Sequence, residues 1–205
     1  MMQSVKNHPQ IYNGEIVAGS LLVPESRKIA RLLLNGTNSV AWHQAIMVNN
    51  ILQKRSPVSA KRQTRLIKHR LDLMKPELWK MVVKGSSDIA AQALLAAAIK
   101  HSRLLGDFMD KIIREKWRTF KQDISPKDWT ELLEICTQID PTILDWSDST
   151  LSKLRQVIFR ILAEAKYIDG TRTLKLLPVS IFPQVRQYLT ENNETYVLRC
   201  MEATQ

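Results

Sequence analysis

The chain has 205 residues, of which 30 are Lys or Arg and 20 are Asp or Glu, so its formal net charge is +10 and its sequence pI is about 9.8. A hydrophobic content of 44% excludes wholesale disorder, and two cysteines are too few for a disulfide scaffold or a cysteine-rich zinc module. No secretion signal is recognisable, and the longest small-apolar run, Ile89 to Ile99, is about half of a membrane span. We therefore expect a cytoplasmic protein without a membrane partner, and such a positive charge is typical of nucleic-acid binding.

Stretches rich in Leu, Ile, Ala, Lys and Arg, separated by few glycines and prolines, predict helices joined by short turns. In chain order the predicted helices span about Leu22–Leu34, Ser39–Gln53, Ser59–Met74, Pro76–Lys84, Asp88–Gln122, Ser125–Gln138, Ile143–Trp146, Ser147–Tyr167, Pro183–Leu189 and Tyr196–Met201. The stretch Asp88–Gln122 is either one long helix or two helices that join at Gly106. The segment from Thr171 to Val179 is predicted to form a short β-hairpin or to remain extended. The expected fold class is all-α, a compact multi-helix globular fold containing helix-turn-helix units, with at most a short C-terminal β-hairpin.

The domain organisation is less clearly marked, because the sequence contains no Gly/Ser-rich linker and no repeat. We predict an N-terminal basic helical unit over residues 1–76 and a C-terminal helical unit over residues 77–205. One compact domain is the alternative.

The helix predicted at Ser59–Met74 has two different faces. Successive residues 100° apart place five residues on a core side, namely Ala60, Thr64, Ile67, Leu71 and Met74. The opposite side carries Lys61, Arg62, Arg65, Lys68 and His69. This helix is therefore predicted to have one buried face and one cationic face.

The excess positive charge is concentrated in one segment, Ser26 to Leu71, which holds ten basic residues and no Asp or Glu. These ten are Arg27, Lys28, Arg31, Lys54, Arg55, Lys61, Arg62, Arg65, Lys68 and Arg70. The remainder of the chain has 20 basic and 20 acidic residues, so it is neutral. The whole net charge thus belongs to this segment.

The charge pattern favours a phosphate-binding surface on a helix-turn-helix. Helix Ser39–Gln53 would brace the unit, Lys54 to Val58 would form the turn, and Ser59–Met74 would be the recognition helix. The residues predicted to face base edges are Lys61, Arg62, Gln63 and Arg65, and those predicted to contact phosphates are Lys54, Arg55 and Lys68. The alternative is a solvated basic face without a partner.

A second candidate lies near the C-terminus, where two helices flank the turn at Pro141 and the 171–177 segment resembles a wing. The basic residues predicted to contact DNA there are Lys153, Arg155, Arg172 and Lys175. An ordinary helical domain with a solvated face accounts for this pattern equally well, because helix pairs are frequent in all-α proteins.

The sequence lacks the residue patterns of known catalytic sites. It contains no phosphate-cradling glycine loop, GxSxG, HExxH or CxxC motif. The four histidines lie far apart in sequence, which predicts no metal site, and Glu164 and Lys166 lie about 200° apart on a predicted helix, which disfavours a nuclease centre with Asp148. The five tryptophans are predicted to be core anchors. We expect no enzymatic activity and no cofactor.

Several short segments together resemble a known family. They are Gly19 to Ala30, Asn49 to Gln53 and Ser59 to Arg62, read as GSLLVPESRKIA, NNILQ and SAKR. In this combination the chain resembles the BrxA family of BREX (bacteriophage exclusion) defence systems over nearly its whole length.

The resemblance implies a small all-α component of a phage-defence system that methylates host DNA and blocks replication of unmodified phage DNA. It implies helix-turn-helix units that bind double-stranded DNA, a likeness to the antitermination factor NusB, and other BREX components, a methyltransferase and an ATPase, as partners. It supports DNA contact at Lys61 and Arg62, and it carries no catalytic residues because methylation belongs to a separate methyltransferase subunit.

Two alternatives to a DNA-binding subunit remain. In the first, the protein is an assembly subunit whose basic surface docks acidic protein partners, and the acidic stretch from Asp128 to Asp148 is a further docking face. In the second, the protein binds RNA, because phosphate contacts alone do not distinguish RNA from DNA.

Overall fold

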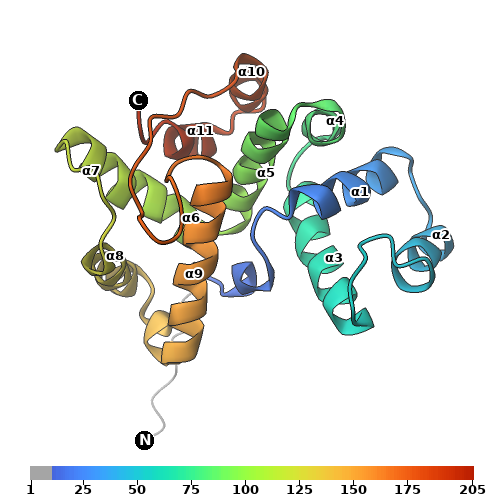
Figure 1. The fold of residues 1–205 in the computed structure, drawn as a ribbon, viewed down its shortest axis with the longest axis horizontal. Coiled ribbons are helices and arrows are strands. Elements are labelled where there is room, and N and C mark those ends of the chain that lie inside the picture. The colour runs from blue at the N-terminus through green and yellow to red at the C-terminus, as the bar shows by residue number, and fades with distance from the viewer. Residues whose placement is uncertain (1–10) are drawn as a thin grey trace, which may run out of the picture.

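The computed structural model describes residues 11–205, and the fold is all-α, as predicted (Figure 1). Its α-helices are α1 (Val23–Leu34), α2 (Ser39–His43), α3 (Pro57–Asp72), α4 (Pro76–Lys84), α5 (Ser87–His101), α6 (Arg103–Asp107), α7 (Arg114–Arg118), α8 (Pro126–Ile139), α9 (Asp148–Glu164), α10 (Pro183–Glu191) and α11 (Thr195–Met201). Short 3-10 helices η1 (Glu15–Ala18) and η4 (Pro141–Asp145) and π-helices η2 (Gln44–Val48) and η3 (Phe108–Ile113) complete the elements.

Helix starts follow the local sequence closely. Proline occupies the first turn of α1, α3, α4, α8 and α10, where its missing N–H costs nothing. The Ser56 hydroxyl caps α3 by accepting a hydrogen bond from the Ser59 amide at 3.2 Å. A capping box of Ser125 and Asp128 is present at the start of α8. The starts of these helices are therefore confirmed.

The core surrounds α5, which lies at the centre of the molecule (Figure 1). Residues 90–99 of this helix are all buried, so the small-apolar run is a core helix as predicted. Buried side chains on either side of residue 76, such as Ile67 and Leu95, belong to the same hydrophobic cluster. The domain boundary at residue 76 remains a prediction. No helix among residues 11–205 is long and apolar enough to cross a membrane.

The tryptophans serve as core anchors, as predicted. Trp129 is buried, and the other four are partly buried and pack against the core cluster. The Trp79 indole also donates a hydrogen bond to the Leu71 carbonyl at 2.8 Å, which joins α4 to the end of α3.

The helix predicted at Ser39–Gln53 is wrong in its last five residues. After α2 the chain widens into the π-helix η2 and leaves helical geometry at Asn49. Asn50 and Gln53 adopt left-handed φ values of 44° and 54°, which end the helix. The connection to α3 therefore covers residues 49–56, longer than a helix-turn-helix turn of about three or four residues. Helix η2 nevertheless contacts α3.

The predicted joint at Gly106 is also wrong. The helix breaks at Ser102, whose φ of −124° and ψ of 101° are extended, and Gly106 lies inside α6. A methyl group at Gly106 would lie 2.4 Å from the Tyr196 hydroxyl oxygen. The glycine is needed for this close approach of α11 and not for a turn.

Gly106→Ala is accordingly expected to destabilise the fold by about 2 kcal/mol, because the added methyl group must displace the Tyr196 ring. Urea unfolding measures the change. In an unconstrained helix the same substitution stabilises by about 0.5–1 kcal/mol, so a more stable variant would show that the Tyr196 contact is not restrictive.

The segment predicted as a hairpin or extended chain begins with a turn over residues 171–173, and Leu174 has a left-handed φ of 56°. In the described part of the chain it forms no named strand, and its pairings are isolated bridges of Lys175 with Asp123 and of Leu176 with Ile168. The turn before them is held by Asp169, whose Oδ1 accepts hydrogen bonds from the Thr173 hydroxyl at 2.6 Å and from the Lys175 amide at 2.9 Å.

Helix η1 lies between the N-terminal helices and the rest of the fold (Figure 1). It packs against both α3 and α9. The Glu164 carboxylate of α9 accepts hydrogen bonds from the Ser20 hydroxyl at 2.7 Å and from the Leu21 amide at 2.8 Å, just before α1. The element that positions α3 is therefore anchored to α9.

Candidate nucleic-acid interface

Helix α3 carries the split of faces expected from its sequence. Ala60, Thr64, Ile67 and Leu71 are buried, and Met74, just past its end, is buried as well. On the opposite side Lys61, Arg62, Arg65 and His69 are exposed, and Lys68 is half-buried. We call the exposed row of Lys61, Arg62 and Arg65 the α3 ridge.

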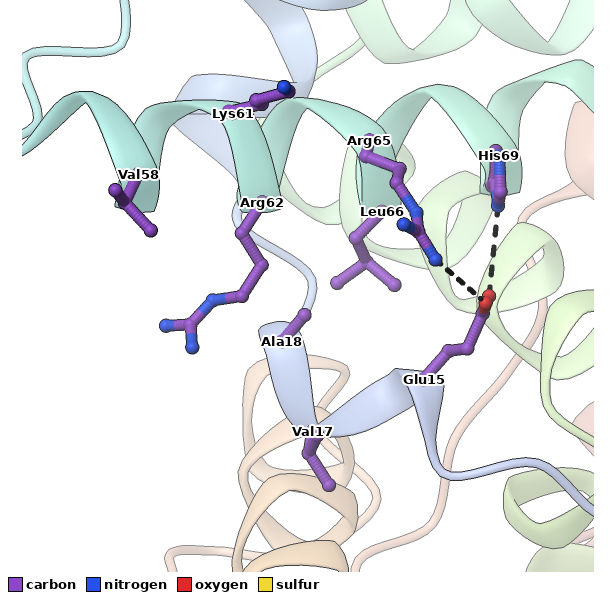
Figure 2. Close-up of a pocket in the computed structure, with 9 residues that line it drawn as sticks. All are labelled: Glu15, Val17, Ala18, Val58, Lys61, Arg62, Arg65, Leu66 and His69. Atoms are coloured by element: carbon purple, nitrogen blue, oxygen red, sulfur yellow. Dashed lines mark hydrogen bonds and ion pairs between the residues drawn. The ribbon is translucent and has the colours of Figure 1, made fainter.

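Grooves lie on both sides of the α3 ridge. One, of about 600 Å³, runs between α3 and η1 and is lined by Val58, Lys61, Arg62 and Arg65 on one wall and by Val17 and Ala18 on the other (Figure 2). The second, of about 540 Å³, lies toward α2 and η2 and is lined by Trp42, Ile46 and Met47 together with Lys61, Arg65 and Lys68. The ridge therefore projects between two hollows.

The ten basic residues of the acid-free segment do not all share this surface. Three of them hold backbone carbonyls: Arg27 bonds Val83, Gly85 and Ser86, Lys28 bonds Ile51, and Arg70 bonds Gly19 and Ser20. Arg70 is 2% exposed, and burial lowers its pKa to about 10 against the opposing effect of the Glu164 charge. These three stabilise the fold and leave seven side chains for other uses.

Three more basic residues make ion pairs. Lys54 pairs with Glu25 at 2.5 Å and is half-buried against α1, and Lys68 pairs with Asp72 at 2.5 Å within α3. Arg65 pairs with Glu15 at 3.3 Å, with its own side chain 69% exposed. Among the described residues Arg31, Arg55, Lys61 and Arg62 make no ion pair and are exposed. Of the contact residues predicted in the acid-free segment, Arg55, Lys61 and Arg62 thus make the fewest interactions within the fold.

Gln63 differs from its predicted neighbours on α3. Its side chain is half-buried, and its Oε1 is buried without a hydrogen-bond partner among the described residues. The structure therefore places Gln63 off the α3 ridge, between the exposed and buried faces.

A cluster of three titratable side chains lies at one end of the η1 groove. Glu15 Oε2 is 3.1 Å from His101 Nε2 and 3.7 Å from His69 Nδ1, and the two imidazole rings are 6.4 Å apart. Figure 2 shows Glu15 reaching from η1 toward both Arg65 and His69. His69 and His101 lie far apart in sequence, and the fold brings them together because the ends of α3 and α5 meet.

The charges around this cluster set its protonation. Burial and the nearby Arg70 lower the pKa of His101 below its ordinary value, despite the opposing Glu15 carboxylate. Although partial burial opposes ionisation, hydrogen bonds from His101 and Arg65 hold the pKa of Glu15 below its usual range. At neutral pH Glu15 is therefore ionised and His101 is neutral.

The second predicted surface is formed by α9 and the 171–175 turn. A hollow of about 440 Å³ there is lined by Arg155, Arg160 and Thr171. Lys153, Arg172 and Lys175 are exposed and Arg155 is half-buried. The structure thus brings Arg155 close to the turn that carries Arg172 and Lys175.

Sequence reasoning missed an aromatic side chain near this second surface. Phe120 is 92% exposed, has a left-handed φ of 54°, and follows α7 in a segment whose Gln122 and Ile124 pair with Leu176 and Leu174. The sequence placed Phe120 inside a long helix, and no residue pattern there marks the helix end at Arg118.

Comparisons with known proteins agree with one another. The BrxA family model matches residues 10–193. BREX protein BrxA of Paramagnetospirillum magneticum is 49% identical over 94% of this chain and 97% of its own length, and BREX protein BrxA of Escherichia coli is 29% identical over 97% and 93%. A crystal structure of an uncharacterized protein from Magnetospirillum magneticum matches with a TM-score of 0.87 at 48% identity, covering 94% of this chain and 98% of that one.

Proposed function

The chain belongs to the BrxA family of the BREX phage-defence system, and on this premise we propose that it is a non-enzymatic subunit that binds double-stranded DNA. The observation that supports this most is the α3 ridge. Lys61 and Arg62 are exposed there between two grooves and make no ion pair with the described residues. Cations without protein partners are available for phosphates without first breaking an ion pair.

In this proposal the first half of α3 meets the duplex. Lys61 and Arg62 contact base edges or phosphates, Arg55 contacts a phosphate from the preceding loop, and Arg65 joins them at the cost of its pairing with Glu15. Lys54 and Lys68 attract the DNA mainly through the electrostatic field of their charges and do not contact it directly, because each is already paired with a carboxylate. Gln63 has a minor part, because its Oε1 is turned into the protein.

The α9 surface extends the same interface. Since η1 packs on both α3 and α9, the two basic surfaces belong to elements that share one support. Lys153, Arg155, Arg172 and Lys175 then add phosphate contacts beyond those of the α3 ridge. We treat the units around α3 and α9 as two helix-turn-helix variants, of which the first has a long turn.

A salt series of binding titrations tests this function. If about five to seven phosphates are contacted, log K is expected to fall with log salt with a slope of about −5 to −6 for duplex DNA. Matched single-stranded DNA and duplex RNA are measured in parallel. Tighter binding to duplex RNA than to duplex DNA would indicate recognition of A-form geometry, and equal binding would indicate phosphate contacts that do not distinguish the two duplexes. Affinity for duplex DNA that does not depend on salt would contradict the proposal.

A second candidate function is docking of other BREX components. Leu144 in η4 is 74% exposed and Ile139 at the end of α8 is 46% exposed, both within the acidic stretch between Asp128 and Asp148. Exposed apolar side chains beside acidic ones suit a protein partner. Co-purification with a methyltransferase or ATPase component that persists after nuclease treatment, and is lost in a Leu144→Glu variant, would support docking at this surface.

A further inference from the structure

Three metal-ligating side chains from three separate elements converge beside the α3 ridge. Glu15 comes from η1, His69 from the last turns of α3, and His101 from the end of α5. Their potential ligand atoms all lie within 4.8 Å of one another. We propose that Glu15, His69 and His101 form a Zn²⁺-binding site. None of these three ligands is a proposed DNA-binding residue, although Arg65 of the α3 ridge contacts Glu15.

The distances fit a common metal ion. With metal–ligand bonds of about 2.0–2.1 Å, tetrahedral coordination places neighbouring ligand atoms about 3.3 Å apart. The distances from Glu15 Oε2 are 3.1 Å to His101 Nε2 and 3.7 Å to His69 Nδ1. Both edges at the carboxylate lie within a few tenths of an ångström of this geometry. The third edge, between the two histidine nitrogens, is at most 4.8 Å, and side-chain rotation must bring it to the tetrahedral value when the ion binds.

The arrangement of the donors also fits. Both histidines approach the same carboxylate oxygen, Oε2, whereas Arg65 contacts the other oxygen, Oε1, at 3.3 Å. A carboxylate held in this way offers one oxygen to the metal and keeps its orientation through the other. Two imidazoles and one carboxylate are a donor set that Zn²⁺ favours, and they leave a fourth position for water.

The three proposed ligands differ in how far their side chains are buried. The His101 side chain is 7% exposed, whereas those of Glu15 and His69 are 41% and 49% exposed. Nε2 of His101 faces the cluster, as its 3.1 Å contact with Glu15 Oε2 shows, and the other ring nitrogen, Nδ1, is buried without a hydrogen-bond partner among the described residues. The site is therefore fixed on the α5 side and open to ions on the groove side.

Nearby positive charge sets an upper limit on affinity. Arg65 lies on Glu15 and Arg70 lies close enough to His101 to affect its protonation, and both repel a cation. The single carboxylate offsets only part of this charge. We accordingly expect weaker binding than in a structural four-ligand zinc site, with one ion per chain tying η1 to α3 and α5.

Isothermal titration of the full chain with ZnCl₂ tests the proposal. Wild type is expected to bind one Zn²⁺ per chain, and Co²⁺ in its place is expected to give the intense visible absorption of tetrahedral coordination. His69→Ala and Glu15→Gln are expected to weaken Zn²⁺ binding at least tenfold. Both positions are exposed, so the variants are expected to fold, and circular dichroism without metal checks this.

The matched control is His43→Ala, which removes an exposed histidine of α2 outside the cluster and is expected to leave Zn²⁺ binding unchanged. Absence of Zn²⁺ binding by wild type, or binding that is equal in His69→Ala and wild type, would overturn the proposal. DNA binding measured in EDTA is expected to persist, so failure of the metal site and failure of the DNA-binding proposal are distinguishable.

Discussion

Replacing Lys61 and Arg62 together by glutamate is expected to weaken binding of duplex DNA about 100-fold near physiological salt. Each loses a charge-assisted phosphate contact of about 1.5 kcal/mol, and a total near 3 kcal/mol corresponds to two factors of ten. The salt slope should become shallower by about two, since two fewer counterions are released. Fluorescence anisotropy with a labelled duplex measures both quantities. Stability should change little, because both side chains are exposed and make no ion pair with the described residues.

The matched control exchanges Lys80 and Lys84 of α4 for glutamate. These two residues are also exposed, and the exchange changes the net charge by the same amount, but α4 packs on α1 and α5 away from the α3 ridge. We expect this control to lose less than threefold in affinity for duplex DNA, because the lower net charge of the protein weakens its long-range attraction to DNA only slightly at this salt. An equal loss in the two double variants would mean that net charge alone, and not the α3 ridge, governs binding.

Asp107→Ala is expected to destabilise the folded chain by about 3–5 kcal/mol, the largest effect on stability that we predict. Asp107 is 1% exposed and accepts hydrogen bonds from Tyr12 at 2.6 Å and from Tyr196 at 2.7 Å. It also pairs with Arg103 at 2.9 Å and Lys111 at 3.2 Å. The substitution leaves two hydroxyls and two cations without this partner. Urea unfolding measures the loss.

The difference in unfolding free energy between wild type and Asp107→Ala is expected to depend on pH. Although burial opposes ionisation, the two tyrosine hydroxyls and the cations of Arg103 and Lys111 hold the pKa of Asp107 below its usual range. A carboxylate with a lowered folded-state pKa stabilises above its unfolded-state pKa of about 3.9, and this stabilisation is lost as the pH falls through the folded-state pKa. The difference in unfolding free energy between wild type and variant should therefore shrink below about pH 4.

Asp145→Ala is the control for this variant, because Asp145 is exposed and makes no ion pair with the described residues. We expect a change within about 0.5 kcal/mol. A loss below 1 kcal/mol for Asp107→Ala would contradict the view that this buried network holds α6 to α11 and to the chain at Tyr12.

Helix starts were the most predictable part of the fold, because they depend on neighbouring residues. Proline and serine at the start of α3 fix its first turn without help from the core. Helix ends and breaks depended on tertiary contacts. The approach of Tyr196 explains Gly106. The left-handed Asn50 after η2 has a local signal in its residue type, because asparagine often adopts this conformation at helix ends, but the predicted helix ran past it.

The candidate site could be predicted only where one helix supplies it. The faces of α3 follow from periodicity, so Lys61, Arg62 and Arg65 were placed on one side from the sequence alone. Glu15 and His101 are 86 residues apart and meet only because η1 and the end of α5 both lie against α3, which no local pattern encodes. For the same reason the sequence could not show that Arg27, Lys28 and Arg70 hold backbone carbonyls instead of facing a partner.

The most direct test of the α3 ridge as the DNA-binding surface is lysine labelling with a small acetylating reagent, read by mass spectrometry with and without duplex DNA. Lys61 is expected to be strongly protected by DNA, and Lys153 and Lys175 protected to a lesser degree. Lys80 and Lys84, exposed on α4, serve as internal references and should react at the same rate in both samples. Labelling of Lys61 at an unchanged rate in the presence of saturating DNA would contradict the proposed interface.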